Sequence, residues 1–132
     1  MRKPALALAA LFALAVPAAA QQGPRTERVQ FAPGASAKAV SGSIKGYGAI
    51  DYLVSAKAGQ TLSVKLKTSN ASNYFNVTGP GADAALFVGS TSGGDYSGVL
   101  SASGDYKVSV YLMRNAARRG ESAKYTLTVA VK

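Results

Sequence analysis

The chain has 132 residues, no cysteine and no histidine, and 15 Lys and Arg against 6 Asp and Glu, which gives a net charge of +9. The usual general base near neutral pH, the commonest metal ligand and the strongest side-chain nucleophile are therefore missing, so we expect no enzyme, no metal and no cofactor. Disulfides are excluded as well, and the basic charge predicts an acidic partner.

The N-terminus has the three parts of a secretory signal peptide. Arg2 and Lys3 form a positive region, an apolar run follows over residues 5–16, and small residues occupy 18–20. A transmembrane helix is the alternative, but it needs about 20 apolar residues and this run is shorter. We expect residues 1–20 to be cleaved on export, which leaves a soluble protein without a membrane anchor in the periplasm or outside the cell.

The remaining 112 residues suit a single domain. They carry 13 basic and 6 acidic residues, a net charge of +7. Residues 21–27 are polar and show no alternation of apolar and polar positions, which predicts a flexible N-terminal segment. Residues 28–132 form the predicted domain.

Short segments with period-two alternation recur through this domain, as expected for antiparallel strands with one buried face. The three clearest are Thr61–Lys67, Tyr106–Leu112 and Tyr125–Val131. Six weaker candidates cover residues 29–31, 39–44, 49–55, 74–78, 84–89 and 97–101. In the three clear strands the residues expected to face the core are Leu62, Val64, Leu66, Tyr106, Val108, Val110, Leu112, Tyr125, Leu127, Val129 and Val131.

Turn-forming Gly, Ser, Asn and Asp residues separate these segments and leave no room for a helix of normal length. Eight or nine strands with one apolar face each can bury those faces only by packing sheet on sheet. The sequence therefore predicts an all-β fold, a single antiparallel β-sandwich of the jelly-roll type.

The charged residues form no recognisable catalytic or nucleic-acid motif. The four aspartates Asp51, Asp83, Asp95 and Asp105 belong to different strands or turns, and their spacing indicates no paired carboxylates for glycoside hydrolysis. The basic residues are scattered along the chain apart from one cluster. Together with the export signal, this argues against nucleic acid as a partner.

That cluster lies in a long connection, residues 114–121, before the last strand. A minimal hairpin needs two to five loop residues, and this loop carries three arginines, Arg114, Arg118 and Arg119. In a helical turn, Arg114 and Arg118 would project from the same side and offer planar cations to a pair of carboxylates. The alternative is a solvated loop whose charges keep a sheet edge soluble.

Tyr47 is the second candidate for an exposed binding residue. Gly46 and Gly48 flank it, which allows a sharp turn with the ring standing out from the fold. A tyrosine in the sandwich core, with its hydroxyl at the rim, is the alternative.

Two longer motifs contain these candidates, Ile44-Lys45-Gly46-Tyr47 and Arg114-Asn115-Ala116-Ala117-Arg118. Weaker motifs are Phe31-Ala32-Pro33-Gly34, Ser41-Gly42-Ser43, Ala58-Gly59-Gln60, Ser103-Gly104-Asp105-Tyr106 and Tyr125-Thr126-Leu127. In order and spacing they resemble the periplasmic inhibitors of g-type lysozyme over about residues 28–132. The Ala-Gly-Gln and Ser-Gly-x-Tyr segments also resemble pre-peptidase C-terminal domains, which are β-sandwiches.

The resemblance implies a non-enzymatic protein that binds g-type lysozyme and fills its substrate cleft. The implied contacts are Tyr47, Arg114 and Arg118, with Asn115 shaping the loop and Arg119 as an additional contact. The alternative function is a carbohydrate- or cell-wall-binding β-sandwich, in which basic side chains and tyrosines contact peptidoglycan directly.

Overall fold

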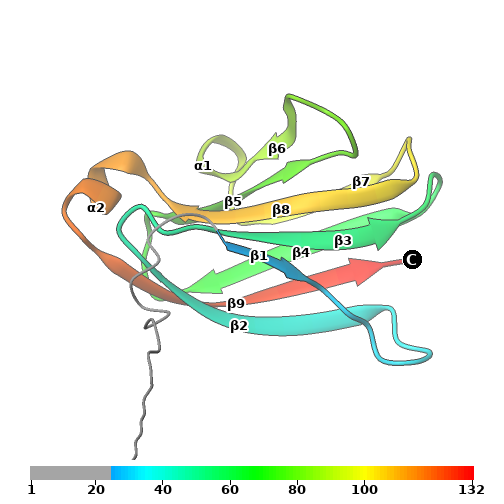
Figure 1. Cartoon of the computed structure of the whole chain (residues 1–132), viewed down its shortest axis with the longest axis horizontal. Coiled ribbons are helices and arrows are strands. Elements are labelled where there is room, and N and C mark those ends of the chain that lie inside the picture. Colours follow the sequence, from blue (N-terminus) through cyan, green and yellow to red (C-terminus); the bar gives the residue numbers. More distant parts are fainter. Residues whose placement is uncertain (1–24) are drawn as a thin grey trace, which may run out of the picture.

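The computed structural model describes residues 25–132, so the predicted signal peptide at 1–20 lies outside the described residues. In this part of the chain, nine strands form two packed β-sheets, and two short helices lie in the connections between strands (Figure 1). The strands are β1 (Arg25–Arg28), β2 (Ala37–Lys45), β3 (Ile50–Ala56), β4 (Thr61–Thr68), β5 (Asn73–Thr78), β6 (Ala85–Val88), β7 (Asp95–Val99), β8 (Gly104–Leu112) and β9 (Ser122–Val131). The helices are α1 (Gly89–Ser92) and α2 (Arg114–Arg118).

The strand order is that of a jelly roll. One sheet has the order β2-β9-β4-β7, and the other has β3-β8-β5-β6 with β1 added at its edge. Every described strand pair is antiparallel except β1 with β3. Two four-stranded sheets in this order form the double Greek key of a jelly roll, so the predicted fold class is confirmed.

The core lies between the two sheets and includes the residues of the three clear strands predicted to face inward. These residues are buried, except that Leu66 and Val131 are only partly buried. Across the core the Tyr52 hydroxyl of β3 lies 2.7 Å from the Tyr125 hydroxyl of β9, which joins the sheets by a buried hydrogen bond. Burial raises the pKa of both phenols above the usual value for tyrosine.

The first strand differs from the prediction. It covers Arg25–Arg28 rather than 29–31, so the end of the segment predicted to be flexible is paired with β3. The N–H of Arg25 donates to the carbonyl of Ala49 at 2.9 Å. All four residues of β1 are exposed, so no apolar alternation marks this strand in the sequence.

An ion pair holds β1 to the neighbouring strands. The Arg28 guanidinium donates two hydrogen bonds to the Asp105 carboxylate of β8, at 3.0 and 2.7 Å. These bonds lower the pKa of Asp105. The N-terminal strand is therefore held by side chains as well as by the backbone ladder.

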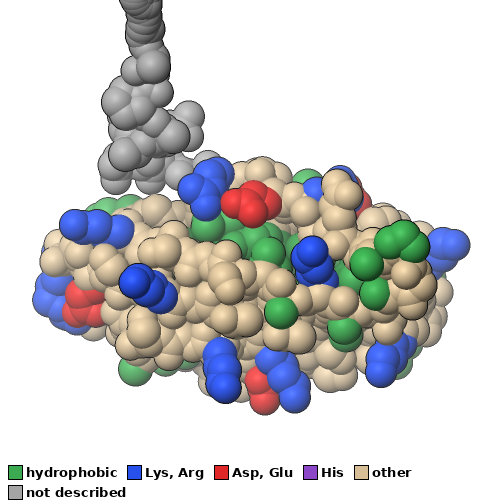
Figure 2. Space-filling view, turned by 90° about the horizontal axis from the view of Figure 1, so that it is seen from below, with side chains coloured by type: hydrophobic (Ala, Val, Ile, Leu, Met, Phe, Trp, Pro, Cys, Tyr) green, Lys and Arg blue, Asp and Glu red, His purple; other side chains and the backbone are tan. Residues whose placement is uncertain are grey.

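The expectation that no helix of normal length interrupts the strands is confirmed within residues 25–132, where α1 has four residues and α2 has five. None of the helices described is long and apolar enough to cross a membrane. Figure 2 shows Lys and Arg side chains spread over the whole visible face, with fewer acidic ones. Positive charge alone therefore does not mark a site on this surface.

Candidate functional site

The two sequence motifs meet at one end of the sandwich. The turn from β2 to β3 carries Tyr47, and α2 follows β8 at the same end (Figure 1). The N–H of Gly46 donates to the carbonyl of Glu121, just after α2, at 2.9 Å. The tyrosine turn and the arginine helix thus lie side by side.

The tyrosine turn is closed by a hydrogen bond from the Gly48 N–H to the Lys45 carbonyl, at 3.0 Å. Gly46 takes a φ of +59°, a conformation that a residue with a Cβ rarely adopts. The turn leaves the Tyr47 side chain 65% exposed. The alternative of a core tyrosine is therefore excluded.

Helix α2 holds its arginines outward because two alanines anchor its inner side. Ala116 is fully buried and Ala117 is 3% exposed. Arg114 and Arg118, one turn apart on the helix, are exposed. The helical turn considered for this loop is present.

Asn115 and Arg119 make contacts within the protein. The Asn115 side-chain oxygen accepts the N–H of Ala116 at 2.8 Å, in the first turn of α2. The Arg119 guanidinium donates to the Glu121 carboxylate at 2.8 Å through Nε. The other Glu121 oxygen accepts the side-chain N–H of Asn70, at 3.0 Å. Both contacts lower the pKa of Glu121 and fix the segment that follows the helix.

Arg114 and Arg118 have no such partner among the described residues. Within residues 25–132 the ion pairs are Arg25–Glu27, Arg28–Asp105 and Arg119–Glu121. The charges of Arg114 and Arg118 are thus available to an anion from another molecule.

Tyr47 and Arg114 share a shallow groove of about 370 Å³ with Tyr111 and Met113. Arg118 and Arg119 are not among its lining residues. The sequence prediction missed Tyr111 and Met113, although Tyr111 is on the outer face of β8 by its alternation with the buried Val110. Two apolar side chains therefore accompany the predicted tyrosine and arginine.

Comparison with known proteins was made by sequence and by structure. No protein-family model matches the chain. It is 36% identical over 109 residues to the inhibitor of g-type lysozyme from Escherichia coli K12, covering 79% of each protein. The crystal structure of PliG from Aeromonas hydrophila, a periplasmic inhibitor of g-type lysozyme, superposes with a TM-score of 0.75 at 41% identity, covering 83% of this chain and 97% of that one. PliG from Salmonella Typhimurium gives 0.64 at 30% identity, covering 82% and 98%.

Proposed function

The chain belongs to the family of periplasmic inhibitors of g-type lysozyme, and we propose that it stops such an enzyme by filling its substrate cleft from the end that carries Tyr47 and α2. The protein itself performs no catalysis. Its partner is a g-type lysozyme, and the compartment in which it acts is the periplasm.

The observation that supports this mode of binding is that Arg114 and Arg118 are exposed and have no ion-pair partner within residues 25–132. Lysozymes hydrolyse glycosidic bonds with carboxylates in a cleft. A guanidinium can form two parallel, charge-assisted hydrogen bonds with a carboxylate, and such bonds are about twice as strong as neutral ones. Two exposed guanidinium groups without an internal partner in residues 25–132 match that chemistry.

Tyr47, Tyr111 and Met113 supply the apolar part of the proposed contact. Tyr47 and Met113 are 65% and 38% exposed, and both line the groove beside Arg114. Tyrosine, methionine and arginine are enriched in the centres of protein interfaces. Burying these side chains around the charged contact would exclude water and strengthen it.

The remaining predicted residues have a positioning role in this proposal. Arg119 and Asn70 hold the Glu121 side chain, and the Glu121 carbonyl holds the Tyr47 turn through Gly46. Asn115 orders the first turn of α2. A surface fixed before binding loses less entropy on association, so these contacts favour high affinity.

Substitution of Arg118 tests the proposal. We expect Arg118→Ala to weaken inhibition of a g-type lysozyme by about 2 to 5 kcal/mol, because truncation would leave a carboxylate of the cleft buried and unpaired. The inhibition constant is measured by clearing of a bacterial cell-wall suspension.

Lys65→Ala is the matched control, because it removes one exposed positive charge from β4, outside the candidate site. We expect this variant to inhibit like the unchanged protein. Small and equal effects of the two substitutions would contradict insertion of Arg118 into the cleft.

A further inference from the structure

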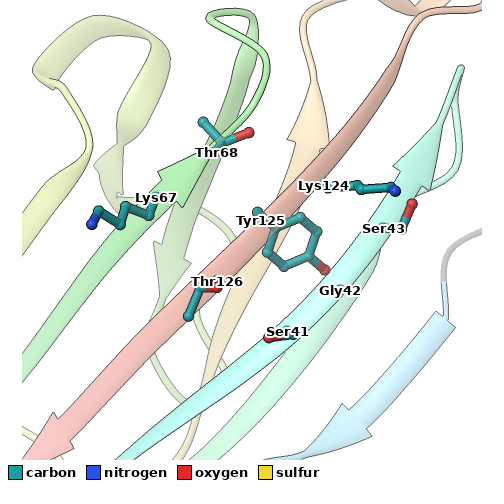
Figure 3. Close-up of a pocket in the computed structure, with 8 residues that line it drawn as sticks. All are labelled: Ser41, Gly42, Ser43, Lys67, Thr68, Lys124, Tyr125 and Thr126. Carbon is teal, nitrogen blue, oxygen red and sulfur yellow. The ribbon is translucent and has the colours of Figure 1, made fainter.

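A second candidate site lies on the outer face of the β2-β9-β4 sheet. It is a shallow groove of about 740 Å³ (Figure 3). Four of the residues that line it are serines or threonines, and two are lysines. The lining residues are Ser41, Gly42, Ser43, Lys67, Thr68, Lys124, Tyr125 and Thr126.

The strand register brings these polar side chains together. Thr126 of β9 is paired with Ser41 of β2 on one side and with Lys67 of β4 on the other. In the next row Lys124 is paired with Ser43. Adjacent strands are about 4.8 Å apart, so hydroxyl-bearing side chains and lysines lie next to one another across the face. Figure 3 shows the ammonium groups of Lys67 and Lys124 pointing to opposite sides of the groove.

The groove is positively charged and has no acidic lining residue. Lys67 and Lys124 form no ion pair with any residue of 25–132. Asp95 on β7 is in register with Lys65 and lines an adjoining groove, which also includes Lys67 and Thr126. An anionic ligand would thus meet two cations and several hydroxyl donors.

The apolar side chains of the surface lie elsewhere. The large hydrophobic residues exposed in the described part of the chain are Tyr47, Leu86, Val88, Val99 and Met113, and none of them lines this groove. Tyr125 is only 4% exposed, so it offers no ring face for stacking on a sugar. The groove therefore suits neither insertion into a lipid bilayer nor recognition of neutral sugars through stacking.

We propose that this groove binds peptidoglycan strands, with its lysines on carboxylates of the polymer and its hydroxyl groups on the sugars. This function goes beyond inhibition and does not require lysozyme. An inhibitor held on the polymer that its target degrades has a raised local concentration where the enzyme works.

The test is co-sedimentation of the mature protein with purified peptidoglycan sacculi, without lysozyme. We expect the unchanged protein to sediment with the sacculi. The double variant Lys67→Gln/Lys124→Gln is expected to bind about tenfold more weakly, since it loses two charge-assisted hydrogen bonds at the surface. Amidation of the sacculus carboxylates should weaken binding of the unchanged protein in the same way.

The matched control is Lys57→Gln/Lys107→Gln, which removes the same charge from a turn and from the outer face of the other sheet. Equal losses of sacculus binding in the two double variants would show that net charge alone causes the effect, and would overturn the proposal. So would absence of sedimentation of the unchanged protein, or stronger binding to phosphatidylglycerol vesicles than to sacculi. Arg118→Ala should sediment like the unchanged protein, which separates this result from that of the inhibition test.

Discussion

The three arginines near α2 differ in what surrounds each guanidinium group. Arg119 is held by Glu121, whereas Arg114 and Arg118 are exposed and have no ion-pair partner within residues 25–132. An unpaired charge is well solvated on a free surface but must find a partner once an interface buries it. In the proposed complex, Arg114 and Arg118 would therefore contact the lysozyme carboxylates, and Arg119 would hold the segment that follows the helix.

The sequence identified most of the candidate residues but not their internal contacts. The two specific motifs contain Tyr47, Arg114 and Arg118, and their contacts with lysozyme stay predictions. The Glu121 contact with Asn70 joins residues 51 positions apart, so no local pattern could indicate it. Met113 was missed because it lies just past the strand, where alternation ends.

At the same scale, the lowered pKa of Asp105 makes the stability of the protein depend on pH. A carboxyl group whose pKa is lower in the folded state stabilises the fold above its unfolded pKa of about 4, and this contribution is lost as the pH falls through the folded value. We expect Asp105→Asn to lower the free energy of unfolding at pH 7. The difference from the unchanged protein should shrink as the pH falls towards about 2.

Urea unfolding at several pH values measures this difference. Asp83→Asn is the control, because Asp83 has no ion pair within residues 25–132 and the charge change is the same. A deficit of Asp105→Asn that stays as large at low pH as at neutral pH would rule out the Arg28 contact as its cause.

Among the elements, strand β2 links the core to the candidate site. It leads directly into the Tyr47 turn, and its Gly42 faces Tyr125 of β9. A Cβ at position 42 would lie 2.5 Å from the Tyr125 hydroxyl oxygen. The absence of a side chain at Gly42 therefore gives the Tyr125 ring the space it needs to reach Tyr52 in the other sheet.

Gly42→Ala should consequently destabilise the fold by about 1 to 3 kcal/mol, the usual cost of an overpacked core. Thermal or denaturant unfolding measures the change. Gly94→Ala is the control, because a Cβ there would make only an ordinary contact, 3.7 Å from the Leu66 carbonyl, and its effect should stay within about 0.5 kcal/mol. Equal stabilities of the two variants would mean that Tyr125 moves aside without loss.

Alternation predicted most clearly the strands that have one buried face. The three clear segments correspond to β4, β8 and β9, with ends that differ by no more than three residues. Strand β1 escaped detection because all its residues are exposed. Strand β7 begins at Asp95, two residues before the predicted segment. Its start was missed because Asp95 is exposed and begins no apolar alternation.

For the molecule as a whole, the number and one-sided character of the strands were enough to predict a sandwich. The order in which the strands pair could not be predicted from alternation, because β9 pairs with β2 and β4, which are far from it in the sequence. The jelly roll presents the tyrosine turn and α2 at one end of the sandwich. The groove lined by Lys67 and Lys124 lies on the outer face of one sheet. One small domain can therefore offer two separate binding surfaces.

Competition with a cleft ligand tests most directly the claim that this end fills the substrate cleft. The protein without residues 1–20 is titrated into a g-type lysozyme by calorimetry, with and without an N-acetylglucosamine oligosaccharide bound in the cleft. If the two exclude each other, oligosaccharide at ten times its own Kd should weaken inhibitor binding about tenfold. Unchanged affinity, with both ligands on the enzyme at once, would contradict occlusion of the cleft.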